Sequence, residues 1–112
     1  MLGPSKAEVW QIDLGGARRH EQKKSRPCII WRDLDHMGMA IVIPFTSSIK
    51  TENAQHTCSI LPNSTNGLEK ESIALLFQIT TVDKKRLVKK LGVLEKKDVQ
   101  IIGHQLKDLL RI

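Results

Sequence analysis

The chain has 112 residues, which is enough for one domain with a single core and without a stabilising disulfide or metal. Charged residues make up 27% of it and hydrophobic residues 40%, a balance that excludes an intrinsically disordered protein. The net charge of +6 favours an anionic partner, such as nucleic acid, an anionic membrane or an acidic protein segment.

Short apolar runs predict β-strands in the first two thirds of the chain. The runs are rich in β-branched and aromatic residues and are separated by polar, glycine- and proline-containing stretches, which favours a small barrel or sandwich. Residues 1–6 precede the first run and are expected to be disordered. Strands are predicted at residues 8–14, 27–31, 39–45, 56–61 and 73–79, with an Asn-Gly turn within residues 62–67.

The last third of the chain has the residue spacing of helices. The segment D-K-K-R-L-V-K-K begins at Asp83 and precedes Gly92, which predicts a short helix with an aspartate cap and a glycine stop. An apolar stripe predicts a closing amphipathic helix; it consists of Val99, Ile102, Leu106, Leu109 and Leu110. We therefore expect residues 1–112 to form one mainly β domain with a C-terminal helix.

Cysteine usage and hydropathy favour a cytoplasmic protein. Cys28 and Cys58 lie in apolar or β-branched runs without the spacing of metal ligands, so we expect buried, reduced thiols, with a single disulfide between them as the alternative. No run approaches the ~20 apolar residues of a membrane span, and the first residues contain no apolar signal segment.

The most unusual stretch is basic and reads R-R-H-E-Q-K-K-S-R-P over residues 18–27. Gly15 and Gly16 precede it and predict a flexible loop, whereas Pro27 holds Arg26 in extended geometry at a strand entrance. A solvated loop is the simpler interpretation of such a charge run. The alternative is a phosphate-binding loop with a rigid arginine beside a carboxylate, Glu21.

Hydroxyl side chains end the third predicted strand at Thr46, Ser47 and Ser48. Such residues usually bind nearby backbone groups. If they face Arg26, they can instead donate hydrogen bonds to a phosphate oxygen.

Five sequence blocks, in order, resemble the MazF/PemK toxin family. They read A-E-V-W-Q-I-D-L (7–14), H-E-Q-K-K-S-R-P (20–27), I-P-F-T-S (43–47), N-G-L-E-K-E-S (66–72) and Q-I-T-T-V-D-K-K-R-L (78–87). Each block alone is weak, but the ordered set covers nearly the whole chain. The resemblance implies an SH3-like barrel that forms a homodimer and is silenced by an antitoxin.

The resemblance also implies a metal-independent endoribonuclease that cleaves single-stranded RNA and needs no cofactor. Arg26 and Thr46 would carry the catalysis, with Glu21 contributing. We expect further contacts with RNA from the basic loop, from a strand-end hydroxyl and from the last block; these residues are Arg18, Arg19, His20, Gln22, Lys23, Lys24, Ser47 and Gln78.

The chain departs from the family at two places. The family's D-P-T turn after the first strand is replaced by Gly15, Gly16 and Ala17. Some relatives also carry an arginine and an acid that assist catalysis where this chain has Leu75 and Phe77. Weakened or altered cleavage, or its loss, is therefore an open alternative.

RNA chemistry agrees with the assigned roles. Cleavage requires a base to deprotonate the 2′-hydroxyl and a group to stabilise the crowded phosphorane. Arginine stays protonated, so Arg26 would stabilise charge and Glu21 or His20 would be the base. Thr46 would donate to a non-bridging oxygen. DNA, which lacks the 2′-hydroxyl, would be inert.

Two other functions use the same features. One is a non-catalytic nucleic-acid-binding barrel. The other is a protein-targeting toxin like the gyrase-directed relative, which acts through an aromatic C-terminal tail, whereas this chain ends L-L-R-I. For a homodimer, Trp31, Met37 and Met39 are candidate interface or core residues, and an acidic antitoxin segment would fill the basic groove.

Overall fold

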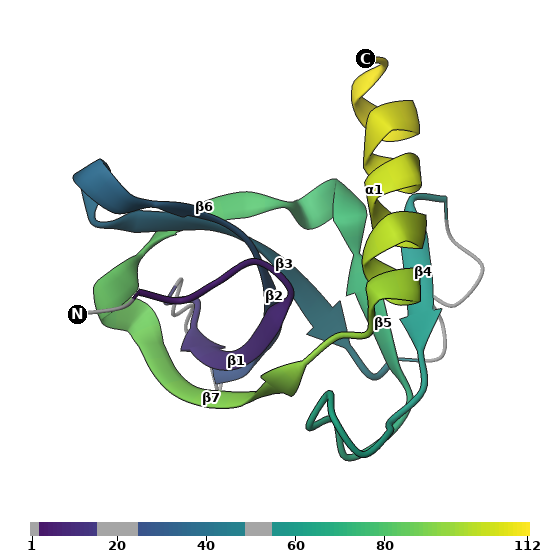
Figure 1. The fold of residues 1–112 in the computed structure, drawn as a ribbon, viewed down its shortest axis with the longest axis horizontal. Helices are drawn as coiled ribbons and strands as arrows, with labels where there is room; N and C mark the ends of the chain where they lie inside the picture. Colours follow the sequence, from purple (N-terminus) through teal and green to yellow (C-terminus); the bar gives the residue numbers. More distant parts are fainter. Residues whose placement is uncertain (1–2, 16–24, 49–54) are drawn as a thin grey trace.

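Figure 1 shows a computed structural model of the chain, which describes residues 3–15, 25–48 and 55–112. In this part of the chain, a curved antiparallel sheet is accompanied by one C-terminal helix, α1, which confirms the predicted fold class. The strands are β1 (Glu8–Asp13), β2 (Ser25–Leu34), β3 (Met39–Thr46), β4 (Thr57–Ile60), β5 (Ser72–Leu75), β6 (Thr80–Asp83) and β7 (Leu87–Val93), and the helix is α1 (Lys96–Leu110).

The sheet curls so that β1, near the start of the chain, pairs with β7, which comes late in the chain. Its order is β4-β5-β3-β2-β1-β7, and β6 pairs with the other end of β3. The first strand, β1, lies between β2, where Val9 is opposite Ile29, and β7, where Glu8 is opposite Val93. The pairing of β2 with β3 shifts register between Ile30 and Arg32, and the two strands bend there. With this bend, β3 pairs with β6 at one end and with β5 at the other.

Two clusters of buried residues fill the two sides of this sheet. Because side chains alternate along a strand, Ile29 of β2 joins one cluster, and Cys28 and Ile30 join the other. The first cluster includes Phe45 and is covered by α1. The second cluster consists of Ile12, Cys28, Ile30, Ala40, Val42 and Val82. The predicted burial of Cys28 is confirmed, while Cys58 is half-buried, and both thiols are free.

The closing helix was predicted with nearly the correct apolar face. Ile102 and Leu106 are buried in the first cluster, and Val99 and Leu109 pack against it. Leu110 is different, since 53% of its surface is exposed. Leu110 lies one turn after Leu106 on the same side of the helix, but it is the last residue of α1, where the helix ends.

The short helix predicted after Asp83 is wrong. The Asp83 side chain does accept a hydrogen bond from the Lys85 N–H, but the turn it caps is a single 3-10 turn, η4 (Lys84–Arg86). The following residues form β7 and pair with β1. Pairing with an otherwise open strand edge outweighs the local helix propensity of this lysine-rich segment.

The strand predicted at residues 73–79 is shorter than expected. It ends at Leu75, and a 3-10 turn, η3 (Leu76–Gln78), follows and leads into β6. The turn forms because the Leu76 N–H donates to the carbonyl of His56, and the Ile79 N–H then donates back to Leu76. Gln78 is therefore an exposed turn residue and not a strand residue.

The predicted turn at residues 62–67 is held by one buried polar side chain. Asn66 is fully buried; its Oδ1 accepts from the Leu68 N–H at 3.0 Å and the Asn63 N–H at 3.3 Å, and its Nδ2 donates to the Leu61 carbonyl at 2.9 Å. Gly67 has φ of +73°, which glycine adopts without strain.

This turn packs directly on β7. A Cβ added to Gly92 would collide with the carbonyl oxygen of Thr65, and one added to Gly67 would collide with the carbonyl oxygen of Leu91. The Val93 N–H donates to Thr65 at 2.8 Å across the same contact. Gly92 is thus required for close backbone packing and not, as predicted, as a helix stop.

Residues 3–6 have defined positions, which corrects the expectation that residues 1–6 are disordered. Pro4 is buried, and the Ser5 N–H donates to the Glu8 carboxylate at 3.1 Å. The Lys6 ammonium lies 4.4 Å from the centre of the Trp31 ring, a cation–π contact. These contacts hold the segment against the barrel.

The other residues considered for an interface differ in exposure. Trp31 packs against the first cluster and is half-buried, as is Met39. Met37 is 70% exposed in the turn that joins β2 to β3. Within the described residues, no helix has both the length and the apolar character that crossing a membrane requires.

Candidate functional site

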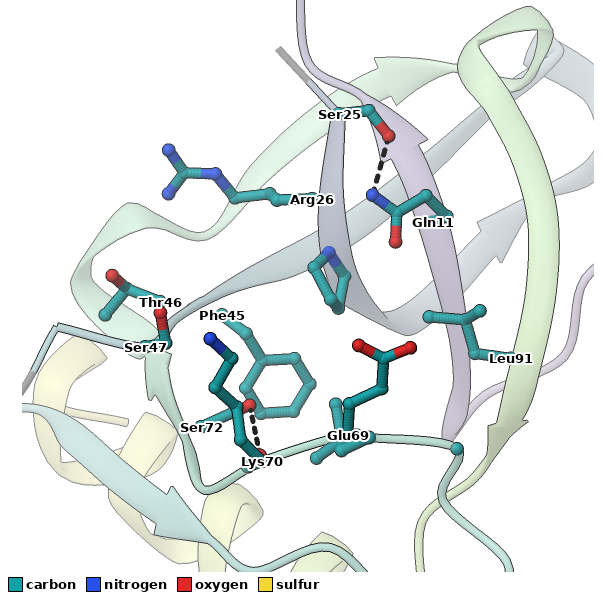
Figure 2. A pocket seen from close by; sticks show the side chains of 13 residues that line it. Gln11, Ser25, Arg26, Phe45, Thr46, Ser47, Glu69, Lys70, Ser72 and Leu91 are labelled. Carbon is teal, nitrogen blue, oxygen red and sulfur yellow. Dashed lines mark hydrogen bonds between the residues drawn. The ribbon is translucent and has the colours of Figure 1, made fainter. Parts of the chain in front are cut away.

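A hollow of about 470 Å³ opens where β2 begins, β3 ends and the segment after Gly67 crosses between them (Figure 2). Apolar side chains form its floor, among them Pro27, Phe45 and Leu91. Polar and charged side chains stand around this floor; they are Gln11, Ser25, Arg26, Thr46, Ser47, Glu69, Lys70 and Ser72. Five segments distant in sequence therefore supply one site, because β1 and β7 add Gln11 and Leu91 to the three segments named above.

Arg26 is placed by the backbone of β2. It is the second residue of the strand, pairs with Ile12 of β1 and is followed by Pro27, which restricts its backbone to extended geometry. Its guanidinium is exposed at the edge of the hollow, as Figure 2 shows. The predicted position of a rigid arginine at a strand entrance is thus the observed one.

Thr46 and Ser47 reach the same hollow from the end of β3. Thr46 is held by pairing with Ile73 of β5. Its Oγ1 accepts a hydrogen bond from the Ser48 N–H at 3.2 Å, which is the local backbone contact considered from the sequence. Because the oxygen acts as an acceptor there, the hydroxyl proton of Thr46 is left to donate elsewhere.

Sequence reasoning missed two charged residues, Glu69 and Lys70. Both follow the Asn66-Gly67 turn, and Figure 2 shows the Lys70 ammonium and the Glu69 carboxylate directed into the hollow. They lie within the block N-G-L-E-K-E-S, so the signal was present. What the sequence did not reveal is that the turn folds back over the ends of β2 and β3.

The charged groups of the hollow are not neutralised by one another. Among the described residues, Arg26, Glu69 and Lys70 have no ion pair, although other lysines and arginines of the chain do. Two cations and two hydroxyls with open hydrogen-bonding capacity form a site for an anion such as phosphate. Gln11 completes the opposite wall; its Nε2 donates to Ser25 Oγ at 2.7 Å.

Cys28 lies beneath Arg26 but is not a candidate nucleophile. Burial raises the pKa of its thiol to about 12, against the opposing effect of the Arg26 charge. Its Sγ lies 3.6 Å from the Arg26 carbonyl oxygen, to which it donates. A thiol in this state is protonated at neutral pH, so it is part of the core.

The structure does not unite all the predicted site residues. Gln78 lies on the η3 turn and does not line the hollow. Leu75 is buried, with 4% of its surface exposed, and Phe77 is 49% exposed. Both side chains are apolar, so neither replaces the polar pair of some relatives. Seven predicted residues lie outside the described residues, in the segment that leads to Ser25; they are Arg18, Arg19, His20, Glu21, Gln22, Lys23 and Lys24.

In the described part of the chain, no three His, Cys, Asp or Glu side chains are grouped so that they could bind a metal ion. The site of this small antiparallel barrel is instead formed by arginine, lysine and hydroxyl groups. The fold and these groups define a small β-barrel protein with a hollow lined by cationic and hydroxyl side chains.

Comparison with known proteins places this barrel in a family. Residues 5–110 match the family described as PemK-like, MazF-like toxins of type II toxin–antitoxin systems, and the chain belongs to it. This match confirms the resemblance inferred from the five sequence blocks.

Solved structures with the same fold include MazF from Deinococcus radiodurans, at 18% identity, with 100% of both chains covered and a TM-score of 0.77. An endoribonuclease in complex with its cognate antitoxin, from a mycobacterial species, is 18% identical with a TM-score of 0.75, over 98% of this chain and 97% of that one. The MazE–MazF complex of D. radiodurans is 16% identical, with 100% and 99% covered and a TM-score of 0.76. At these identities the likeness establishes the fold.

Proposed function

We propose that this toxin is a cytoplasmic endoribonuclease that cleaves single-stranded RNA without a metal ion. The observation that supports the proposal most directly is the hollow itself, in which Arg26, Lys70, Thr46 and Ser47 gather without an ion pair among the described residues. A phosphodiester is the anion that a basic toxin of this family would bind there.

The proposed reaction is an internal transesterification. The 2′-oxygen attacks the neighbouring phosphorus, the bond to the 5′-oxygen breaks, and the products are a 2′,3′-cyclic phosphate and a 5′-hydroxyl. Glu21, or His20 beside it, removes the 2′-proton and passes it to solvent, and the departing 5′-oxygen takes up a proton from water. Arg26 stabilises the phosphorane charge, and Thr46 donates to a non-bridging oxygen.

The test is incubation of the purified protein with mixed-sequence single-stranded RNA in EDTA, followed by mapping of the ends. Arg26→Ala should lower the cleavage rate by about 10²-fold or more, as expected for one preorganised charge stabiliser. Arg32→Ala is the matched control, since Arg32 is an exposed arginine of the same strand and lies outside the hollow. Full activity of Arg26→Ala, or cleavage that requires a metal ion, would contradict the proposal.

We also propose that the toxin is a homodimer and that an acidic antitoxin segment silences it by filling the basic groove. Two shallow RNA surfaces related by a twofold axis would form one longer groove. A disordered acidic peptide with apolar anchors would pair with Arg26 and Lys70. Sedimentation at micromolar concentration tests the dimer. Co-expression with a neighbouring small acidic reading frame tests the silencing, because an antitoxin encoded there should restore growth.

A further inference from the structure

The two walls of the hollow differ in chemistry. On one side stand the cations and hydroxyls of Arg26, Lys70, Thr46 and Ser47 (Figure 2). On the other side stand two acceptors, the carboxylate of Glu69 and the Oε1 of Gln11. The amide of Gln11 is oriented by its hydrogen bond to Ser25, so that its oxygen faces the hollow. An anion alone would use only the first wall.

The space between the walls suits a single nucleotide. Its volume of about 470 Å³ lies within the range of about 300–1,000 Å³ usual for small-molecule sites. Its floor is apolar: Pro27 and Leu91 are half-buried, and the ring of Phe45 is almost fully buried, with 2% of its surface exposed. A base splayed out of a single strand would rest on Pro27 and Leu91 and offer its Watson–Crick edge for hydrogen bonds.

We infer that Glu69 selects the base beside the bound phosphate and that the base preferred is guanine. This inference rests on the proposed ribonuclease function and assigns the specificity of the same site. A carboxylate has two acceptor oxygens and no donor. Guanine presents two adjacent donors on its Watson–Crick edge, N1–H and N2–H, and matches a carboxylate in bidentate fashion.

The other bases match less well. Adenine and cytosine each present one amino donor next to a ring acceptor, so a carboxylate gains one hydrogen bond with either. Uracil presents its single N–H between two carbonyl oxygens, which the carboxylate repels. The expected order of preference is guanine, then adenine or cytosine, then uracil. Gln11 adds a second acceptor for the amino group of guanine.

Glu71 provides a matched control on the same segment. Its carboxylate accepts a hydrogen bond from Ser59 Oγ at 2.6 Å and lies outside the hollow. Glu69→Gln and Glu71→Gln therefore make the same chemical change two residues apart. Both side chains are exposed, so both variants should fold, which circular dichroism can check.

The experiment first maps a cleavage site in mixed-sequence RNA and then varies each base next to it through all four identities. Binding is measured by fluorescence anisotropy on RNAs that carry one 2′-deoxynucleotide at the scissile position, which removes the nucleophile. At one flanking position the wild type should bind guanine most tightly and uracil least. Glu69→Gln should reduce the guanine-to-uracil affinity ratio by about 5- to 150-fold, the effect of one bidentate base contact. Glu71→Gln should leave the ratio unchanged.

Four results would overturn the assignment of Glu69: no flanking position at which the wild type prefers guanine, an unchanged ratio in Glu69→Gln, an equal loss in Glu71→Gln, or, with the four RNAs made without the 2′-deoxynucleotide, slower cleavage of all four by Glu69→Gln without a change in their ranking. The last result would assign Glu69 to chemistry and not to selection. If the wild type neither binds nor cleaves any RNA, the proposed function itself fails. If it cleaves all four RNAs alike, only the specificity is refuted.

Discussion

Replacing Asn66 by alanine should destabilise the domain by about 2–6 kcal/mol. The Leu68 N–H would become a buried donor without a partner, which costs about 1–3 kcal/mol. The Leu61 carbonyl and the Asn63 N–H lie nearer to solvent, so each lost bond contributes about 0.5–1.5 kcal/mol. Since small domains have only about 5–15 kcal/mol of stability, the loss would be a large fraction of the total.

Urea-induced unfolding followed by circular dichroism measures this loss of unfolding free energy, provided that the slope of the free energy against urea concentration is the same in both proteins. The melting temperature should fall by at least about 8 °C, because about 4–8 °C accompanies each kcal/mol in a domain of this size. Asn63→Ala is the comparison. Asn63 Oδ1 also accepts backbone N–H groups, from Thr65 and Asn66, both at 2.9 Å, but at the exposed side of the turn. A loss below about 1 kcal/mol, or equal losses in both variants, would refute the reasoning from burial.

Three further predictions concern the barrel. Gly92→Ala should lower the urea midpoint strongly, because the added methyl would clash with the Thr65 carbonyl. Gly103→Ala in α1 is the comparison and should be neutral or stabilising, because its added methyl would only touch Trp31 at 4.0 Å. Equal urea midpoints for the two variants would count against the clash. In the folded protein, Cys28 should resist iodoacetamide at pH 8, as mass spectrometry can show, and rapid labelling would contradict its burial. Burial raises the pKa of Glu8, but hydrogen bonds from Trp10, Ser5 and Lys90 outweigh it and hold the pKa below the ordinary 4.5. The ionised Glu8 carboxylate therefore stabilises the fold above pH 4.5, and this stabilisation is lost as the pH falls through the folded-state pKa. Glu8→Gln should lower the free energy of unfolding at pH 7 and lower it less in acid. A loss of stability that does not depend on pH would disprove this linkage.

The strands that could be predicted are those whose sequences carry their own signals. The C-I-I-W run of β2 and the A-I-V-I-P-F run of β3 are apolar over a length typical of buried strands, and both were found. The segment L-V-K-K-L-G-V of β7 fits a helix equally well. Only its pairing with β1, roughly 80 positions earlier in the chain, makes it a strand, and no local pattern reports such a partner.

The residues of the candidate site likewise fall into those that the sequence could place and those that it could not. Arg26 could be placed because Pro27 constrains the residue before it, and Thr46 because it ends a clear strand. Glu69 and Lys70 follow the turn at residues 62–67. The sequence predicts this turn but does not show which part of the barrel the chain crosses after it. That path depends on the contact between the turn and Gly92, which is a tertiary property. The roles of Glu21 and the basic loop remain predictions from the sequence.

The pairing of β1 with β7 also determines at what point during synthesis of the chain the hollow can form. The hollow needs Gln11 from β1 and Leu91 from β7, and its turn rests on Gly92. Ribosomes add about 5–20 residues per second, so on the order of ten seconds separate the emergence of the two strands. Until β7 arrives, one edge of β1 is unpaired and the hollow lacks part of its floor. A nascent chain therefore has no complete hollow even when most of it has already been made.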